Sequence, residues 1–141
     1  MTALSADKTR TVAGNPTGFR ASVAGSATIY QGALLAAAAD GYAQPATDTA
    51  SLAILGIACD NVDNSSGNDG DKEVTIQRGQ IEKIAHSALT VADVGKNVVV
   101  EDDATVTDGA AATNDLKVGT LVGFEDGDAL VLIGVFADVD A

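Results

Sequence analysis

The sequence predicts an all-β protein: a small β-barrel or β-sandwich of short strands over residues 21–141, with an extended N-terminal arm over residues 1–20. The 141 residues include fifteen Val, seven Ile and thirteen Thr, whose β-branched side chains pack well on a pleated sheet. Fifteen Gly supply turns between the short apolar runs. The length suits one domain, and the many Ala predict a core of small aliphatic side chains.

The expected strands follow one another with short connections. In chain order they are residues 27–35, 42–45, 52–59, 73–84, 97–101, 104–107, 116–124 and 130–136. Gly32 can divide the first segment in two, and Asp40-Gly41 has the composition of a hairpin turn. Residues 52–59 are nearly all apolar, as expected of a strand buried on both faces. Residues 60–71 form a polar loop of turn-forming residues, and Arg78-Gly79 breaks the segment 73–84.

One helical turn and one tight hairpin are expected in the middle of the second half. Thr90 can cap a single turn over residues 90–95, with Asp93 three residues on and Gly95 to stop it. Asp102-Asp103 then lies between two β-branched segments as the turn of a hairpin.

The last hairpin is the best-marked element. Between Leu116 and Phe124, apolar residues and one Thr recur at every second position, which places them on one face of a strand. Residues 125–128 turn the chain. Residues 130–136 return as a run that is apolar on both faces, so we expect a neighbour on each side.

Charge is divided unevenly along the chain. Residues 1–20 hold three basic residues against one acidic residue, a net charge of +2, whereas residues 21–141 carry −14. The first segment shows no strand or helix period, so it is either a frayed terminus or a basic arm that orders on the acidic surface of a partner. In the second case the candidate contact residues are Lys8, Arg10, Phe19 and Arg20.

The sequence predicts no catalytic, metal or cofactor site, and we expect no enzyme. One Cys and one His cannot supply a Cys-based zinc site or a set of His ligands. His86-Ser87 is the only place where a base and a nucleophile are neighbours, and adjacent strand residues point to opposite faces. Cys59 ends an apolar run and is interpreted as a buried small hydrophobic residue. The spacing in the Asp-rich loop 60–71 does not fit an EF-hand.

The same composition argues against several partners. A net charge of −12 disfavours nucleic acid and anionic membranes. No apolar run reaches the length of a membrane-spanning helix, and residues 1–10 lack the apolar core of a secretory signal. We therefore expect a protein made in a reducing compartment that contacts neither nucleic acid nor membrane.

The order of several short motifs resembles that of tailed-phage head decoration proteins, also called capsid cement proteins. The matching residues are Gly32-Ala33-Leu34, Gly41-Tyr42-Ala43-Gln44-Pro45, Arg78-Gly79, Ala92-Asp93-Val94-Gly95-Lys96 and Lys117-Val118-Gly119. The resemblance covers roughly residues 21–141 and consists of turns and small residues. The basic residues 1–20 lie outside it.

This resemblance implies a structural protein of the virion. Such a protein is made in the host cytoplasm, binds the outer surface of the phage capsid and stabilises the head by bridging adjacent major capsid protein subunits. The resemblance also implies a homotrimer, and the apolar segments 130–136 and 52–59 are the candidate trimer contacts. Lys8, Arg10, Phe19 and Arg20 would then contact the major capsid protein or a neighbouring copy. The alternative function is a secreted or surface β module that binds carbohydrate or calcium through its Asp-rich loops.

Overall fold

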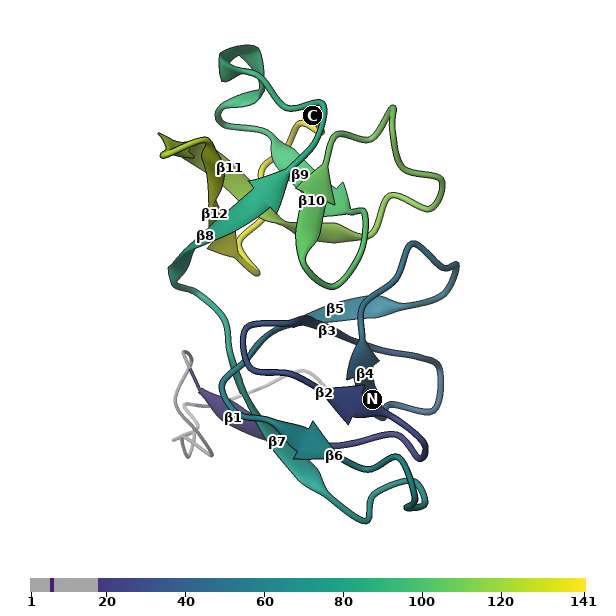
Figure 1. Ribbon diagram of the computed structural model, residues 1–141. Coiled ribbons are helices and arrows are strands. Elements are labelled where there is room, and N and C mark those ends of the chain that lie inside the picture. The colour runs from purple at the N-terminus through teal and green to yellow at the C-terminus, as the bar shows by residue number, and fades with distance from the viewer. Residues whose placement is uncertain (1–5, 7–17) are drawn as a thin grey trace.

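The computed structural model describes Ala6 and residues 18–141, and this part of the chain is all-β, as predicted (Figure 1). Two units lie one above the other: a five-stranded antiparallel sheet and a five-stranded closed barrel. The sheet uses only residues before 78 and the barrel only residues after 80. Of the predicted arm over residues 1–20, residues 1–5 and 7–17 lie outside the described residues.

The sheet has the strand order β1-β7-β5-β3-β4. Its strands are β1 (Phe19–Ser22), β3 (Leu34–Ala37), β4 (Ala43–Pro45), β5 (Ala53–Ala58) and β7 (Glu73–Gln77). Two short strands, β2 (Thr28–Ile29) and β6 (Val62–Asp63), pair with each other. Gly32 separates β2 from β3, and Asp40-Gly41 turns β3 into β4, both as predicted. The strand β6 lies inside the predicted polar loop, where two residues are too few to show an alternating pattern.

The barrel closes in the order β10-β8-β12-β11-β9. Its strands are β8 (Ile81–His86), β9 (Asn97–Val100), β10 (Thr105–Thr107), β11 (Lys117–Glu125) and β12 (Asp128–Ile133). All of its pairs are antiparallel except β8 with β10. The predicted turn after Thr90 is a 3-10 helix, η1 (Val91–Asp93), in which the Thr90 N–H donates to the Asp93 carboxylate at 2.9 Å. The hairpin β9–β10 turns through Asp102-Asp103, as predicted.

The last hairpin, β11–β12, is present, but the predicted faces of its strands are wrong. Glu125 pairs with Asp128, and Asp126 and Gly127 have φ of 52° and 84°, which a two-residue hairpin turn requires. Register shifts between Lys117 and Gly119 and between Leu121 and Gly123 interrupt the alternation of β11. Leu121 is therefore fully buried whereas Val122 is 40% exposed. In β12 only alternate residues are buried, so its outer face is more open than predicted.

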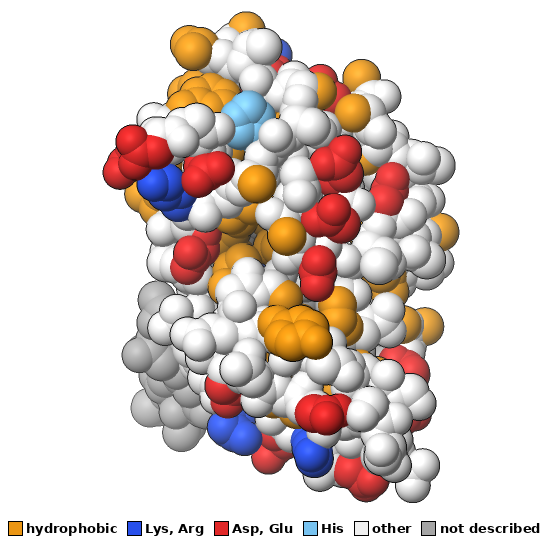
Figure 2. Space-filling model, in the orientation of Figure 1, with side chains coloured by type: hydrophobic (Ala, Val, Ile, Leu, Met, Phe, Trp, Pro, Cys, Tyr) orange, Lys and Arg blue, Asp and Glu red, His pale blue; other side chains and the backbone are white. Residues whose placement is uncertain are grey.

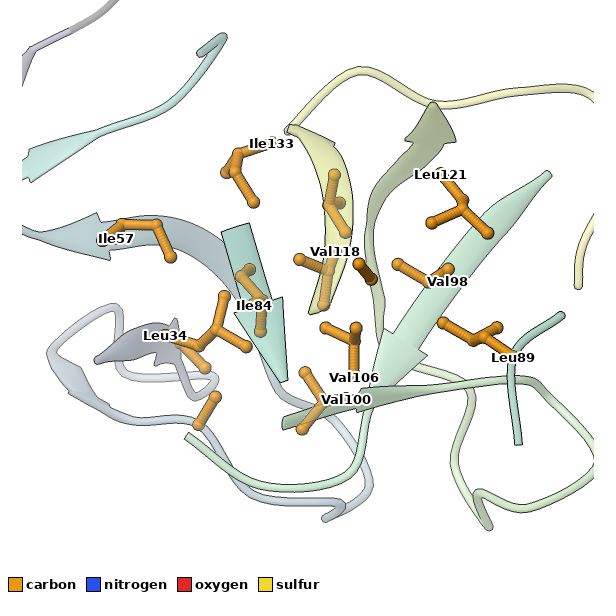
Figure 3. Close-up of a cluster of buried hydrophobic side chains, with 14 of the residues drawn as sticks. Leu34, Ile57, Ile84, Leu89, Val98, Val100, Val106, Val118, Leu121 and Ile133 are labelled. Carbon is orange, nitrogen blue, oxygen red and sulfur yellow. The ribbon is translucent and has the colours of Figure 1, made fainter. Parts of the chain in front are cut away.

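The larger hydrophobic cluster lies between the two units and inside the barrel. Leu34 and Ile57 of the sheet contribute to the same cluster as Ile84, Val100 and the other inward residues of the barrel (Figure 3). A second cluster, which includes Val74 and Ile76, packs on the opposite side of the sheet strands. Every member is aliphatic and most are Val, Ile or Ala, so the core has the composition expected from the sequence.

A buried amide fastens the end of the chain to the barrel. Asn97 of β9 is fully buried, and its side-chain Nδ2 donates to the Ala137 carbonyl at 2.8 Å and to Asp140 Oδ1 at 2.9 Å. Its Oδ1 accepts the Ala137 N–H at 2.7 Å. The Asn97 backbone also bonds Val139 and Ala141, so residues 137–141 lie along β9 like an additional strand.

Candidate functional site

The predicted contact residues divide between described and undescribed parts of the chain. Lys8 and Arg10 lie outside the described residues. Phe19 and Arg20, predicted as the end of the arm, are the first two residues of β1. Among the described residues β1 is an outermost strand of the sheet, and the strand that pairs with it is β7. The basic N-terminal segment therefore joins the body at an edge of the sheet.

Phe19 and Arg20 are adjacent in β1, so their side chains point to opposite faces of the sheet. Phe19 lies opposite buried Ile76 and packs against the second hydrophobic cluster. Arg20 is exposed, donates to Thr75 Oγ1 at 3.0 Å and lies 3.9 Å from a carboxylate oxygen of Glu73. Phe19 is thus part of the body. The Arg20 guanidinium faces solvent beside β7, and binding a partner would require it to give up only weak surface contacts with Thr75 and Glu73.

The most exposed aromatic side chain of the described residues was not predicted from the sequence as a contact residue. Tyr30 follows β2 and is 68% exposed. Three hydrogen bonds fix the turn that follows it. The Gln31 N–H donates to Asn61 Oδ1 at 2.7 Å, and the Gly32 N–H donates to the Ala58 carbonyl at 2.8 Å. The Leu34 N–H donates to the Asp103 carbonyl, also at 2.8 Å. The signal in the sequence is a Tyr placed two residues before a Gly; in the structure that Gly32 has the positive φ of a turn.

Three hollows surround this turn. One of about 340 Å³ lies on the β2 side of Tyr30 and includes Asp63, and one of about 220 Å³ lies on the other side and includes Asp103. A third, of about 410 Å³, lies at the junction of sheet and barrel and includes Glu82. Among the described residues, the lining of each hollow includes one acidic residue and no Lys or Arg. Lys72, whose ammonium donates to the Asp63 carbonyl, is not part of this lining. Figure 2 shows acidic side chains across one face of the molecule, with hydrophobic side chains gathered between them at mid-height.

The Asp-rich loop uses its carboxylates to fix its own backbone. Asp69 accepts the Gly25 N–H at 2.7 Å and Asp71 accepts the Asn68 N–H at 2.8 Å. The fully buried Asn64 donates to the carbonyls of Ala24 and Asn68, both at 3.0 Å, and packs on Gly67. This is the bonding expected of turn-forming residues. Within residues 18–141 and Ala6, no group of three or more His, Cys, Asp or Glu side chains is placed to hold a metal ion.

Several carboxyl groups are held in their charged form. Backbone hydrogen bonds from Thr113 and Asn114 lower the pKa of Asp48, which joins the β4–β5 loop to the loop before β11. Hydrogen bonds from Ser65 lower the pKa of Asp63, and the Asn97 amide lowers that of Asp140. Burial and nearby carboxylates have the opposite effect on Cys59, whose pKa they raise.

His86 and Ser87 are not arranged as a base and a nucleophile. The Ser87 hydroxyl has two acceptors within reach, Thr107 Oγ1 at 3.0 Å and a Glu101 carboxylate oxygen at 3.2 Å. The His86 ring packs against Phe124 with the ring centroids 5.1 Å apart, and its Nδ1 is buried without a hydrogen-bond partner. In the part of the chain that the structure describes, no helix is long and apolar enough to cross a membrane.

A scan against protein-family models and a search of curated proteins found no match to this chain.

Proposed function

We propose that this chain is a non-enzymatic structural protein of a phage virion that binds the outer surface of the capsid and bridges adjacent major capsid protein subunits. One observation supports this most directly. The basic N-terminal segment joins an acidic body at β1, an outermost strand of the sheet. A segment that leaves a sheet edge can cross to a neighbouring protein without disturbing the body, and it can add a strand to that neighbour.

The body packs as one unit, which suits such a role. The sheet and the barrel share one hydrophobic cluster, in which side chains of both are buried. Seventeen residues can extend over roughly 55 Å, which is enough to cross a junction between capsomers. A shell of many copies is stabilised by many contacts of this modest size, each of which forms only when the capsomers lie at the correct spacing. The negative body disfavours nonspecific clumping of the copies.

The structure defines where the segment should be cut to test the proposal. Because Phe19–Ser22 pairs with β7, a deletion must end at residue 17 to leave the sheet intact. We expect this deletion to abolish binding to empty expanded heads of the phage that encodes the protein, while the melting temperature stays unchanged. Binding is measured by co-sedimentation with the heads.

A matched pair of variants separates charge from length. Lys8→Glu with Arg10→Glu keeps the full segment and should weaken head binding strongly. Lys83→Glu with Lys96→Glu makes the same change of charge on the barrel and should leave binding nearly unchanged. Full occupancy of the heads by the deletion variant would refute the proposal.

A further inference from the structure

The Tyr30 surface, defined as Tyr30 with the three hollows around its turn, has the features of a docking site for a cationic segment. A Tyr side chain that projects from a fixed turn loses little conformational freedom on binding, and Tyr is enriched among residues that contribute most to protein interfaces. Its ring face attracts Arg and Lys. The acidic residues beside it are Asp63 on one side and Asp103 on the other.

The sequence contains one segment that complements this surface. Residues 1–20 carry a net charge of +2, next to a body of −14; with Arg20 in β1, the segment that precedes the sheet holds Lys8 and Arg10 against Asp7. Lys8 and Arg10 are two residues apart, so in an extended backbone their side chains point to the same side, about 7 Å from each other. Both cationic groups can therefore face the same surface.

We propose that, when no capsid is bound, the Tyr30 surface binds the N-terminal segment of a second copy of this chain, with Arg10 and Lys8 placed over Tyr30 and beside Asp63 and Asp103. This inference rests on the proposed function, in which the N-terminal segment binds a neighbouring protein; in the free protein that neighbour is a second copy. Two bodies that each carry −14 repel one another, and a basic segment exchanged between them offsets that repulsion. An exchange from each copy to the next is a head-to-tail contact, which closes into a ring when the rotation permits.

The test is sedimentation velocity of the full-length protein over a range of concentrations, without capsids. We expect the wild type to associate and the association to weaken as salt is added, because salt screens exposed ion pairs. Tyr30→Ala should weaken association by roughly fivefold or more, the scale of one cation–π contact. Asp63→Lys with Asp103→Lys should abolish association, and so should Lys8→Glu with Arg10→Glu.

The decisive variant carries all four charge reversals in one chain. Because the attractive pairs are then restored with exchanged signs, this variant should associate again. The control is Glu125→Lys with Asp138→Lys, two exposed acidic residues outside the hollows, which should not abolish association. Melting curves show whether each variant is folded. If Asp63→Lys disturbs its loop, Tyr30→Ala still tests the surface, because it removes only an exposed side chain.

The outcomes separate this inference from the proposed function. A wild type that stays monomeric at every concentration overturns the inference, and so does a four-fold variant that fails to associate while folded. Head binding is measured independently: if wild type binds heads but does not associate through Tyr30, only the inference is wrong. If it associates but ignores heads, the proposed function is wrong and the exchange stands.

Discussion

Replacing Asn97 by Ala should remove the fastening of residues 137–141 to the barrel. The change deletes three side-chain hydrogen bonds, two to Ala137 and one to Asp140, and leaves the Ala137 N–H and carbonyl without protein partners. At about 0.5–1.5 kcal/mol for each bond, together with the small cavity left in a fully buried position, we expect a loss of about 2–4 kcal/mol. A loss of this size is a large fraction of the stability of an ordinary domain.

The assays are urea denaturation and thermal denaturation of the full-length protein, with amide hydrogen exchange to locate the change. The melting temperature should fall by roughly 8–15 °C for a chain of this length. In the Asn97→Ala variant, the amides of Ala137 and Ala141 should exchange faster than in the wild type, where both donate to Asn97. This acceleration should exceed any change at the amides of β12.

Asp140→Asn is the matched control for the same clamp. It keeps a side-chain oxygen near the Asn97 amide but removes the charge that Lys117 contacts at 3.3 Å, so it should have a much smaller effect. If the free energy of unfolding of Asn97→Ala lies within about 0.5 kcal/mol of the wild-type value, the range of ordinary surface substitutions, Asn97 does not fasten residues 137–141.

Three other predictions follow from single contacts. Gly119→Ala should lower the free energy of unfolding by about 1–3 kcal/mol in urea denaturation, because its Cβ would collide with the Leu132 carbonyl of β12. Gly123→Ala is the control: its Cβ has room, so the change should be nearly neutral. Equal effects of the two substitutions would contradict this prediction. Hydrogen bonds lower the pKa of Asp48 in the folded protein, so Asp48 contributes stability above its unfolded pKa and this contribution should be lost as the pH falls through the folded pKa. The free energy of unfolding of Asp48→Asn should therefore fall less steeply with decreasing pH than that of the wild type. An unchanged dependence on acidic pH would contradict this prediction. Cys59 should react with a thiol reagent more slowly in the native protein than in urea near neutral pH, because burial and nearby carboxylates raise its pKa and reduce the thiolate; equal rates would show that the thiol is not shielded.

Residues whose role depends on local geometry were predictable from the sequence. The turns at Asp40-Gly41 and Asp126-Gly127 are formed by residues that tolerate positive φ, and the capped turn after Thr90 needs only side chains three residues apart. The expected strand segments are present for the same reason: β-branched runs between such turns have few other choices.

Features that depend on long-range pairing were not predictable. The buried face of β11 changes at its bulges, which arise from the register with β9 and β12 and leave no mark in the strand itself. Phe19 and Arg20 read as part of an arm because the strand that holds them, β7, is more than fifty residues away. Tyr30 became a candidate only once the hollows beside it were known, because Asp63 and Asp103 come from different parts of the chain.

The division of the chain into an early sheet and a late barrel has a consequence during synthesis. Every strand of the sheet precedes residue 78, so a ribosome releases the whole sheet before any barrel strand emerges. Until then, Leu34 and Ile57 lack the barrel side chains that cover them in the finished protein. A nascent chain halted at this stage presents an apolar sheet face, which is a substrate for chaperones and a site of aggregation. Production of the protein in quantity therefore depends on how quickly residues 81–133 follow the first half.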